Sequence, residues 1–206
     1  MEFSWKEMVV VWVPLFAIID PFGGIPVFLS LVQGEKNIAR IALKSCLFAF
    51  LVLVIFLFAG RIILDFFRVS IPAFQVGGGS IIFLTGLPML FAYPLGLKRA
   101  GAEIEEKEME GDISLVPLGV PMLAGPGAIT TVLVLADHFQ SFYGNLMILG
   151  SIFSVLMISY LLFWQAERIL GLIGRTGLNF LTRIMGLVLI VVAVQYILSG
   201  IKNFFH

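Results

Sequence analysis

The stretch FAIIDPFGGIP (residues 16–26) places one carboxylate, two prolines and two adjacent glycines inside an apolar run. The run extends from Met8 to Gly34, and Asp20 is its one charged residue. Proline removes an amide donor and clashes with the carbonyl four residues earlier, while glycine readily leaves helical angles. The stretch therefore predicts a helix broken near its middle, and the meaning of the break depends on the surrounding solvent.

The composition is that of an integral membrane protein. Of the 206 residues, 60% are hydrophobic and 13% are charged, whereas a soluble domain carries about 25% charged residues. Mean hydropathy is +1.06. A helix needs about 20 apolar residues to cross a bilayer core of roughly 30 Å. Six segments have the required character, namely 8–34, 45–60, 69–97, 113–136, 139–166 and 184–201.

We therefore expect an all-α polytopic membrane protein with six transmembrane helices. Strands of a membrane barrel would alternate apolar and polar residues, but CLFAFLVLVIFLFAG (46–60) is apolar on every face. The charged stretch KRAGAEIEEKEMEGD (98–112) predicts a cytoplasmic linker over residues 94–116. This linker divides the chain into segments 1–93 and 117–206.

The distribution of Lys and Arg predicts the orientation, because cytoplasmic connections carry an excess of these residues. Connections one, three and five hold nine of them, against four in the remaining connections and termini. Both termini are therefore expected outside. The nine are Lys36, Arg40, Lys44, Lys98, Arg99, Lys107, Arg168, Arg175 and Arg183; the four are Lys6, Arg61, Arg68 and Lys202.

The two segments resemble each other. At an offset of 107 residues, RIILDFFR (61–68) falls on RILGLIGR (168–175), and Gly79 falls on Gly186. At an offset of 105, Asp20-Pro21 falls on Gly125-Pro126. Each segment contains three predicted spans, so the second enters the membrane from the opposite side. The sequence thus predicts two inverted-topology three-helix repeats, an architecture of many secondary transporters.

Both repeats open with a span that is expected to be broken at the membrane midplane. In the first, residues 20 and 25 precede prolines and are expected to be extended, and Gly23 and Gly24 add the freedom to leave helical angles. The fourth span, with PLGVPMLAGPGAITT (117–131), carries the same signals. Kinked helices are one interpretation, but two broken spans at corresponding positions point to a binding site.

Asp20 has two compatible interpretations. An Asp-Pro pair favours an N-cap followed by the first residue of a helix, which would make Asp20 the cap of a half-helix. A carboxylate at membrane depth also suits the ammonium of a substrate, a cation or a proton. The sequence leaves open whether Asp20 binds one of these or only caps.

The half-helix that begins near Gly127 would supply a positive charge opposite the carboxylate of Asp20. Free amides and the positive end of its dipole suit a carboxylate, and Thr130 and Thr131 add hydroxyls one turn further on. An amino acid zwitterion has the matching charges. The predicted substrate-binding residues are Asp20, Pro21, Gly23, Gly24, Gly125, Pro126, Gly127, Thr130 and Thr131. Gly78, Gly79 and Gln195 form a second tier, for which helix packing or interhelical hydrogen bonding is the preferred interpretation.

Other classes of function lack the residues they need. Cys46 is the single cysteine, so an intramolecular dithiol carrier is excluded. The two histidines, His138 and His206, lie at span ends, and we expect no metal site and no cofactor other than a coupling proton or sodium ion. No nucleophile-and-base set lies at depth, so we expect no enzyme. No basic tract suggests nucleic acid, so the expected partners are a small solute and the lipid bilayer.

Four blocks resemble the MarC family of membrane proteins, and especially its archaeal small neutral amino acid transporters. The blocks are DPFGGIPVFLSL (20–31), AFQVGGGSIIFLTGLPML (73–90), GVPMLAGPGAITTVL (119–133) and LTRIMGLVLIVVAVQYILSGI (181–201). In that family the position of Gly24 is often asparagine, and that of Asp20 can also be asparagine. This difference argues against an indispensable proton carrier at Asp20.

The resemblance implies a secondary transporter of glycine, alanine and similar amino acids in the prokaryotic cytoplasmic (inner) membrane. It would work by alternating access, with one repeat rocking against the other, and would be coupled to an ion gradient. An exporter or a channel for another small polar solute is the alternative. Six spans are enough to enclose a small site, so we expect a functional protomer; a dimer and the direction of transport stay open.

Overall fold

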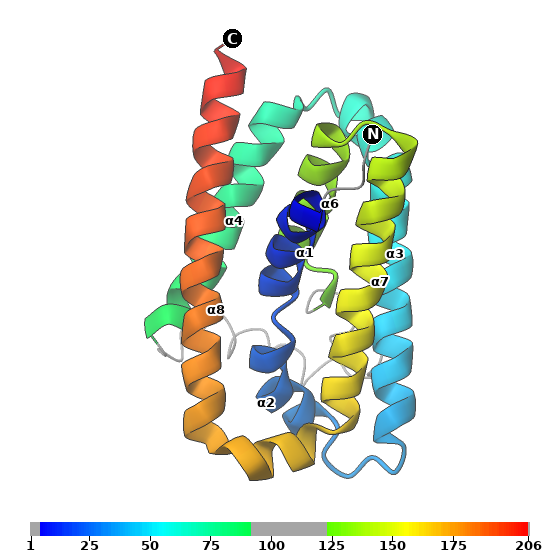
Figure 1. Ribbon diagram of the computed structural model, residues 1–206, viewed down its shortest axis with the longest axis vertical. Coiled ribbons are helices and arrows are strands. Elements are labelled where there is room, and N and C mark those ends of the chain that lie inside the picture. The colour runs from blue at the N-terminus through cyan, green and yellow to red at the C-terminus, as the bar shows by residue number, and fades with distance from the viewer. Residues whose placement is uncertain (1–4, 92–122, 206) are drawn as a thin grey trace.

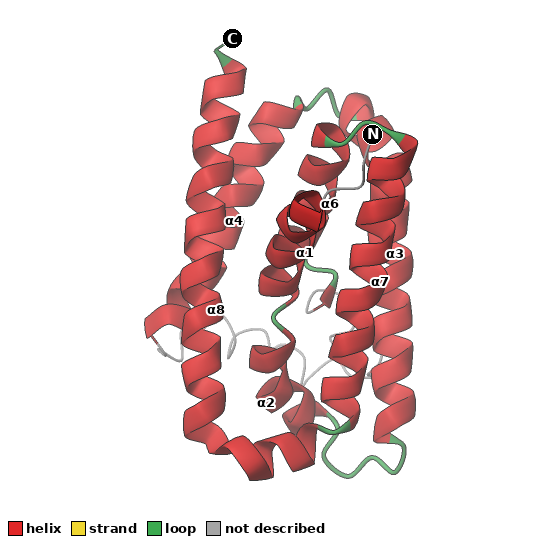
Figure 2. Cartoon of the chain, in the orientation of Figure 1, coloured by secondary structure: helices red, strands yellow, loops and turns green. Residues whose placement is uncertain are grey.

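The computed structural model describes residues 5–91 and 123–205, and these residues form helices and no strand. Figure 2 shows this helical composition. The helices are α1 (Trp5–Ile19), α2 (Pro21–Leu31), α3 (Ile38–Phe66), α4 (Ile71–Phe91), α6 (Pro126–His138), α7 (Phe142–Trp164) and α8 (Ala166–Phe204).

Five segments among the described residues are long and apolar enough to cross a membrane. One of them is Trp5–Leu31, which comprises α1 and α2 together. The others are α3, α4, α7 and α8. The expected fourth span falls largely on residues outside the described ranges, and its described part, α6, has 13 residues. The predicted linker 94–116 also lies outside them.

The helices run side by side along the long axis of the molecule (Figure 1). The connections 67–70 and 139–141 lie at the same end as the C-terminal end of α8, and the connections 32–37 and Gln165 lie at the other end. This alternation is the one that successive membrane crossings require. Which end faces the cytoplasm stays a prediction.

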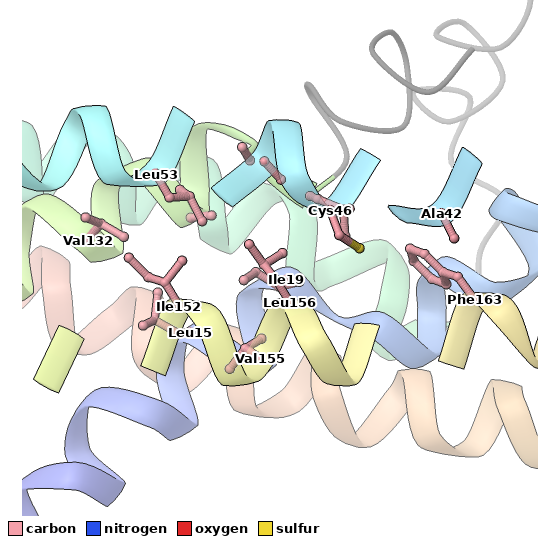
Figure 3. Packing of buried hydrophobic residues seen from close by; sticks show 14 of the residues in the cluster. Leu15, Ile19, Ala42, Cys46, Leu53, Val132, Ile152, Val155, Leu156 and Phe163 are labelled. Carbon is pink, nitrogen blue, oxygen red and sulfur yellow. The ribbon is translucent and has the colours of Figure 1, made fainter. Parts of the chain in front are cut away.

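Two separate groups of buried side chains form the interior. The larger joins α1, α2, α3, α6, α7 and the first part of α8. Within it, Leu15, Leu53, Val132 and Ile152 point toward one another from four helices (Figure 3). The smaller group consists of Ala17, Ile82, Leu189 and Ala193, which come from α1, α4 and α8. Accordingly α4 packs chiefly against α8 and α3 against α7, with α1, α2 and α6 between the two pairs.

The outer faces are apolar. On α3, Leu47, Leu51, Phe58 and Ile62 form a stripe of more than half exposed side chains, spaced as one face of a helix. Soluble monomers rarely expose a contiguous apolar patch this extensive. The surface suits contact with lipid chains, as the composition predicts.

The chain leaves helical geometry at one residue of the quoted stretch, Asp20, which has φ 43° and ψ 65°. The conformational freedom of Gly23 and Gly24 is not used, because both lie within α2. The expectation of extended geometry at residues 20 and 25 is wrong, because Asp20 is left-handed and Ile25 is helical. Pro26 lies inside the same helix. A single left-handed residue suffices because Pro21 has no amide to continue the hydrogen bonds of α1, and Asp tolerates the left-handed region better than most residues.

Candidate functional site

Asp20 ends one helix and begins the next. Its amide donates to the carbonyl of Phe16 at 3.0 Å, which closes α1, and its own carbonyl accepts from the amide of Gly24 at 3.0 Å. Its Oδ1 accepts from the amide of Gly23 at 3.1 Å, and Pro21 is the first residue of α2. The prediction that Asp20 is an N-cap is confirmed. A role for it in binding a substrate or proton stays a prediction.

Gly23 provides space for this carboxylate. A Cβ on Gly23 would overlap the side chain of Asp20. Asp20 is 8% exposed, and Gly23 and Gly24 are also buried. Gly23 therefore contributes by positioning the carboxylate, and the buried backbone of α2 lies directly against it.

The beginning of α6 has the same Pro arrangement without an acidic cap. Gly125 is the N-cap residue, with φ −70° and ψ 171°, and Pro126 is the first helical residue. No side chain caps this helix within the described part of the chain. The first-turn amides of Gly127 and Ala128 therefore present the positive end of a helix dipole without a carboxylate of their own.

The two helix beginnings occupy one region of the bundle. A Cβ placed on Gly127 would lie 3.3 Å from Cγ2 of Ile18 and 3.1 Å from Cγ1 of Ile82. Ile18 is two residues before Asp20, so the junction of α1 and α2 lies beside the first turn of α6 (Figure 1). The structure thus brings the segment of Asp20 and Pro21 near the segment of Gly125, Pro126 and Gly127.

Thr130 and Thr131 are fully buried, and both hydroxyls donate to their own helix. Thr130 Oγ1 donates to the carbonyl of Pro126 at 2.8 Å, and Thr131 Oγ1 donates to that of Gly127 at 3.0 Å. Thr130 packs against Gly78 of α4, where an added Cβ would overlap its side chain. Thr130 and Gly78 therefore form a helix–helix contact, in line with the packing interpretation of Gly78.

Gln195 lies apart from this region. Its side chain is on an exposed face of α8, and its Nε2 donates to Ser199 Oγ at 3.1 Å. The neighbouring residue, Tyr196, is the one directed inward: its hydroxyl lies beside Thr131 and has no hydrogen-bond partner in the described residues. Tyr196 was not among the residues predicted from the sequence. The available signal was helical spacing, since Tyr196 lies three residues after the buried Ala193.

Gln75 of α4 is a second buried polar group outside the set of predicted site residues. It is 7% exposed, and its Oε1 has no hydrogen-bond partner in the described ranges. Among the buried polar residues of those ranges, which also include Ser45, Ser151 and Ser159, Asp20 alone carries a carboxylate. The electrostatics of the interior therefore centre on Asp20 and on the positive ends of α2 and α6.

The helices are long and apolar, and their outward faces carry apolar side chains. With a buried carboxylate at a helix junction, this bundle is that of a polytopic integral membrane protein. The comparisons agree: the chain belongs to the MarC family of integral membrane proteins, whose model matches residues 5–205.

The chain is similar to several UPF0056 membrane proteins. A UPF0056 membrane protein of Aquifex aeolicus is 35% identical, over 98% of both chains. Another, of Methanocaldococcus jannaschii, is 36% identical over 92% of this chain and 93% of its own. YvbG of Bacillus subtilis, also a UPF0056 membrane protein, is 35% identical over 100% of this chain and 98% of its own. No solved structure matches the chain.

Proposed function

We propose that this protein is a secondary transporter of small neutral amino acids such as glycine and alanine. The observation that carries the proposal is the buried carboxylate of Asp20 beside a helix, α6, that begins without an acidic cap. A substrate ammonium pairs with Asp20, and the substrate carboxylate takes the place of the missing cap at Gly127 and Ala128. Each end of the zwitterion thereby meets the opposite charge.

The substrate is small because buried backbone and closely packed isoleucine side chains surround this region. Gly23 and Gly24 are buried at the beginning of α2, and Gly127 is held against Ile18 and Ile82. A larger side chain would need space that these contacts occupy. Glycine and alanine are therefore preferred over leucine.

An inverted repeat, with breaks near the membrane midplane, is part of the proposal and is supported by matching contacts. A Cβ on Gly79 would lie 3.0 Å from the Ala193 carbonyl and 3.3 Å from the Ile197 amide nitrogen. Under the repeat offset of 107 residues, Gly79 corresponds to Gly186. Ala193 and Ile197 correspond to Gly86 and Leu90. A Cβ on Gly186 would lie 3.0 Å from the Gly86 carbonyl and 2.7 Å from the Leu90 amide nitrogen. Such reciprocity is expected of a two-fold axis between α4 and α8.

The moving bodies in this proposal are pairs of helices drawn from both repeats. Rocking one whole repeat against the other would separate α4 from α8, and these two helices share an extensive close-packed contact. The α4–α8 pair therefore moves as one body relative to the α3–α7 pair. The broken helices α1–α2 and α6 lie between them and expose the substrate to each side in turn.

Uptake into proteoliposomes tests the proposal. The full chain is reconstituted, and labelled alanine uptake is measured under an imposed proton gradient and then under a sodium gradient. We expect accumulation that unlabelled glycine inhibits and leucine does not, and the effective gradient identifies the coupling ion. Uptake that is accelerated by alanine inside the vesicles indicates a carrier, because a channel shows no such exchange. No alanine or glycine transport under either gradient would contradict the assignment.

A further inference from the structure

A cavity of about 240 Å³ lies at the end of the bundle where α7 is followed by α8. It is remote from the junction at Asp20, since its walls come from the last turns of α2 and α7 and the first turns of α3 and α8. Leu29, Ile38, Phe163 and Trp164 form an apolar wall. Gln165, Glu167 and Arg168 form its polar part.

Both charges of this cavity are available to a ligand. Within the described part of the chain, neither Glu167 nor Arg168 makes an ion pair or a side-chain hydrogen bond. Consecutive residues on a helix do not face each other, so the two side chains do not neutralise one another. The cavity thus presents one acid and one guanidinium at separate points above an apolar wall.

The first part of α8, which borders the cavity, has the features of a helix at the level of lipid headgroups. Residues 166–173 run across the end of the bundle before the chain turns at Gly174, which has φ 69° (Figure 1). Leu172 on this segment is 86% exposed, as on a helix that rests in the membrane interface. The half-exposed Trp164 stacks on Tyr160 with ring centroids 6.3 Å apart, and such aromatic residues gather at membrane interfaces.

We propose that this cavity binds a phospholipid whose headgroup carries both a phosphate and a primary ammonium, the chemistry of phosphatidylethanolamine. Arg168 binds the phosphate, which guanidinium groups suit by geometry and charge. Glu167 accepts hydrogen bonds from the ammonium, and Leu29, Ile38 and Phe163 contact the first part of an acyl chain. A free glycine or alanine has the same two charges but no chain to cover the apolar wall.

The test measures lipid binding to the purified full-length protein in detergent by native mass spectrometry and by the shift in thermal unfolding. The probes are phosphatidylethanolamine, phosphatidylcholine and phosphatidylglycerol with identical acyl chains, and alanine alone. The variants are Glu167→Gln and Arg168→Gln. Glu35→Gln and Arg175→Gln are the matched controls, because these residues lie at the same end of the molecule and outside the cavity lining.

We expect phosphatidylethanolamine to bind best. Phosphatidylcholine has no N–H to donate to Glu167, and phosphatidylglycerol has no ammonium, so each should bind about tenfold more weakly, as the loss of one charge-assisted hydrogen bond predicts. Either cavity variant should lower the affinity for phosphatidylethanolamine by a similar factor, and the two controls should not. Equal binding of the three lipids, unchanged binding in both cavity variants, or displacement of the lipid by alanine would overturn the proposal. Transport does not enter this readout, so the result is independent of the proposed function.

Discussion

At the scale of the residue, Asp20 combines an ordinary structural role with an unusual location. The Asp-Pro pair predicts a helix cap from sequence, and the hydrogen bond to Gly23 confirms it. The sequence could not predict that one left-handed residue separates α1 from α2. Prolines and glycines indicate that a helix can be interrupted, but they do not show which residue leaves helical geometry. Pro26 is tolerated inside α2, as prolines in membrane helices are when neighbouring groups re-satisfy the backbone.

Replacing Gly23 by alanine should disturb this cap. The new methyl group would overlap the Asp20 carboxylate, so we expect the loss of a capping interaction, about 1–2 kcal/mol, and a lower midpoint of thermal unfolding in detergent. Gly77→Ala is the matched control, because a Cβ there meets nothing within 4 Å. Equal midpoints for the two variants would show that the glycine does not position the carboxylate.

At the scale of the element, apolar runs predict the cores of the helices and miss their ends. The predicted sixth span, 184–201, lies inside α8, which extends from Ala166 to Phe204 with a non-helical residue at Gly174. Charged residues interrupt the apolar run before 184, yet the chain is helical again after Gly174 and stays helical through Arg175 and Arg183. Long basic side chains can reach the interface from within a membrane helix. The hydropathy of a segment predicts which residues lie in lipid, whereas backbone hydrogen bonding determines where the helix begins and ends.

The sequence predicts that some helices pack closely, but it does not predict which helices contact each other. Consecutive glycines predict close packing of α4, and the offset of 107 residues relates Gly79 to Gly186. Which helix each glycine meets depends on the folded arrangement: Gly78 contacts α6, and Gly79 contacts α8. The region around Asp20 and Gly127 was predicted, but the inward side chain of Tyr196 was missed in favour of Gln195, because polarity alone does not give the face of a helix.

Gly186→Ala should loosen the α4–α8 contact. Its Cβ would lie 2.7 Å from the backbone nitrogen of Leu90, and backbone moves only if the helices separate. We expect destabilisation of about 1–3 kcal/mol, as for other overpacked positions, measured as a lower unfolding midpoint. Gly150→Ala in α7 is the control, because that position is open; an equal effect of both substitutions would contradict the close contact.

At the scale of the whole molecule, the interior divides into two packing units that do not coincide with the two halves of the chain. The small group around Ile82 and Leu189 joins α4 with α8, and the large group joins α3 with α7. Close-packed contacts resist gradual deformation and move as units. In the proposed transport cycle, the molecule would separate along this division.

Distances between spin labels test this division in proteoliposomes. Labels at Leu84 of α4 and Leu187 of α8, both exposed, should keep one distance distribution with and without alanine. For labels at Leu84 and at the exposed Leu51 of α3, the distance distribution should change when alanine is added. Cys46→Ala removes the native thiol from the background. A changing Leu84–Leu187 distance together with a constant Leu84–Leu51 distance would contradict motion as helix pairs.

In the proposed transporter the charge of Asp20 binds the substrate ammonium, and exchange of labelled alanine in proteoliposomes measures whether that charge is needed. Asp20→Asn retains a side chain that caps helices and tolerates left-handed geometry, so the variant should unfold at nearly the wild-type temperature. Asp65→Asn, at an exposed position of α3, is the control. We expect exchange to fall by at least about tenfold in Asp20→Asn and to be unchanged in Asp65→Asn. Wild-type exchange in a folded Asp20→Asn protein would show that Asp20 is only a helix cap and that its charge does not bind the substrate.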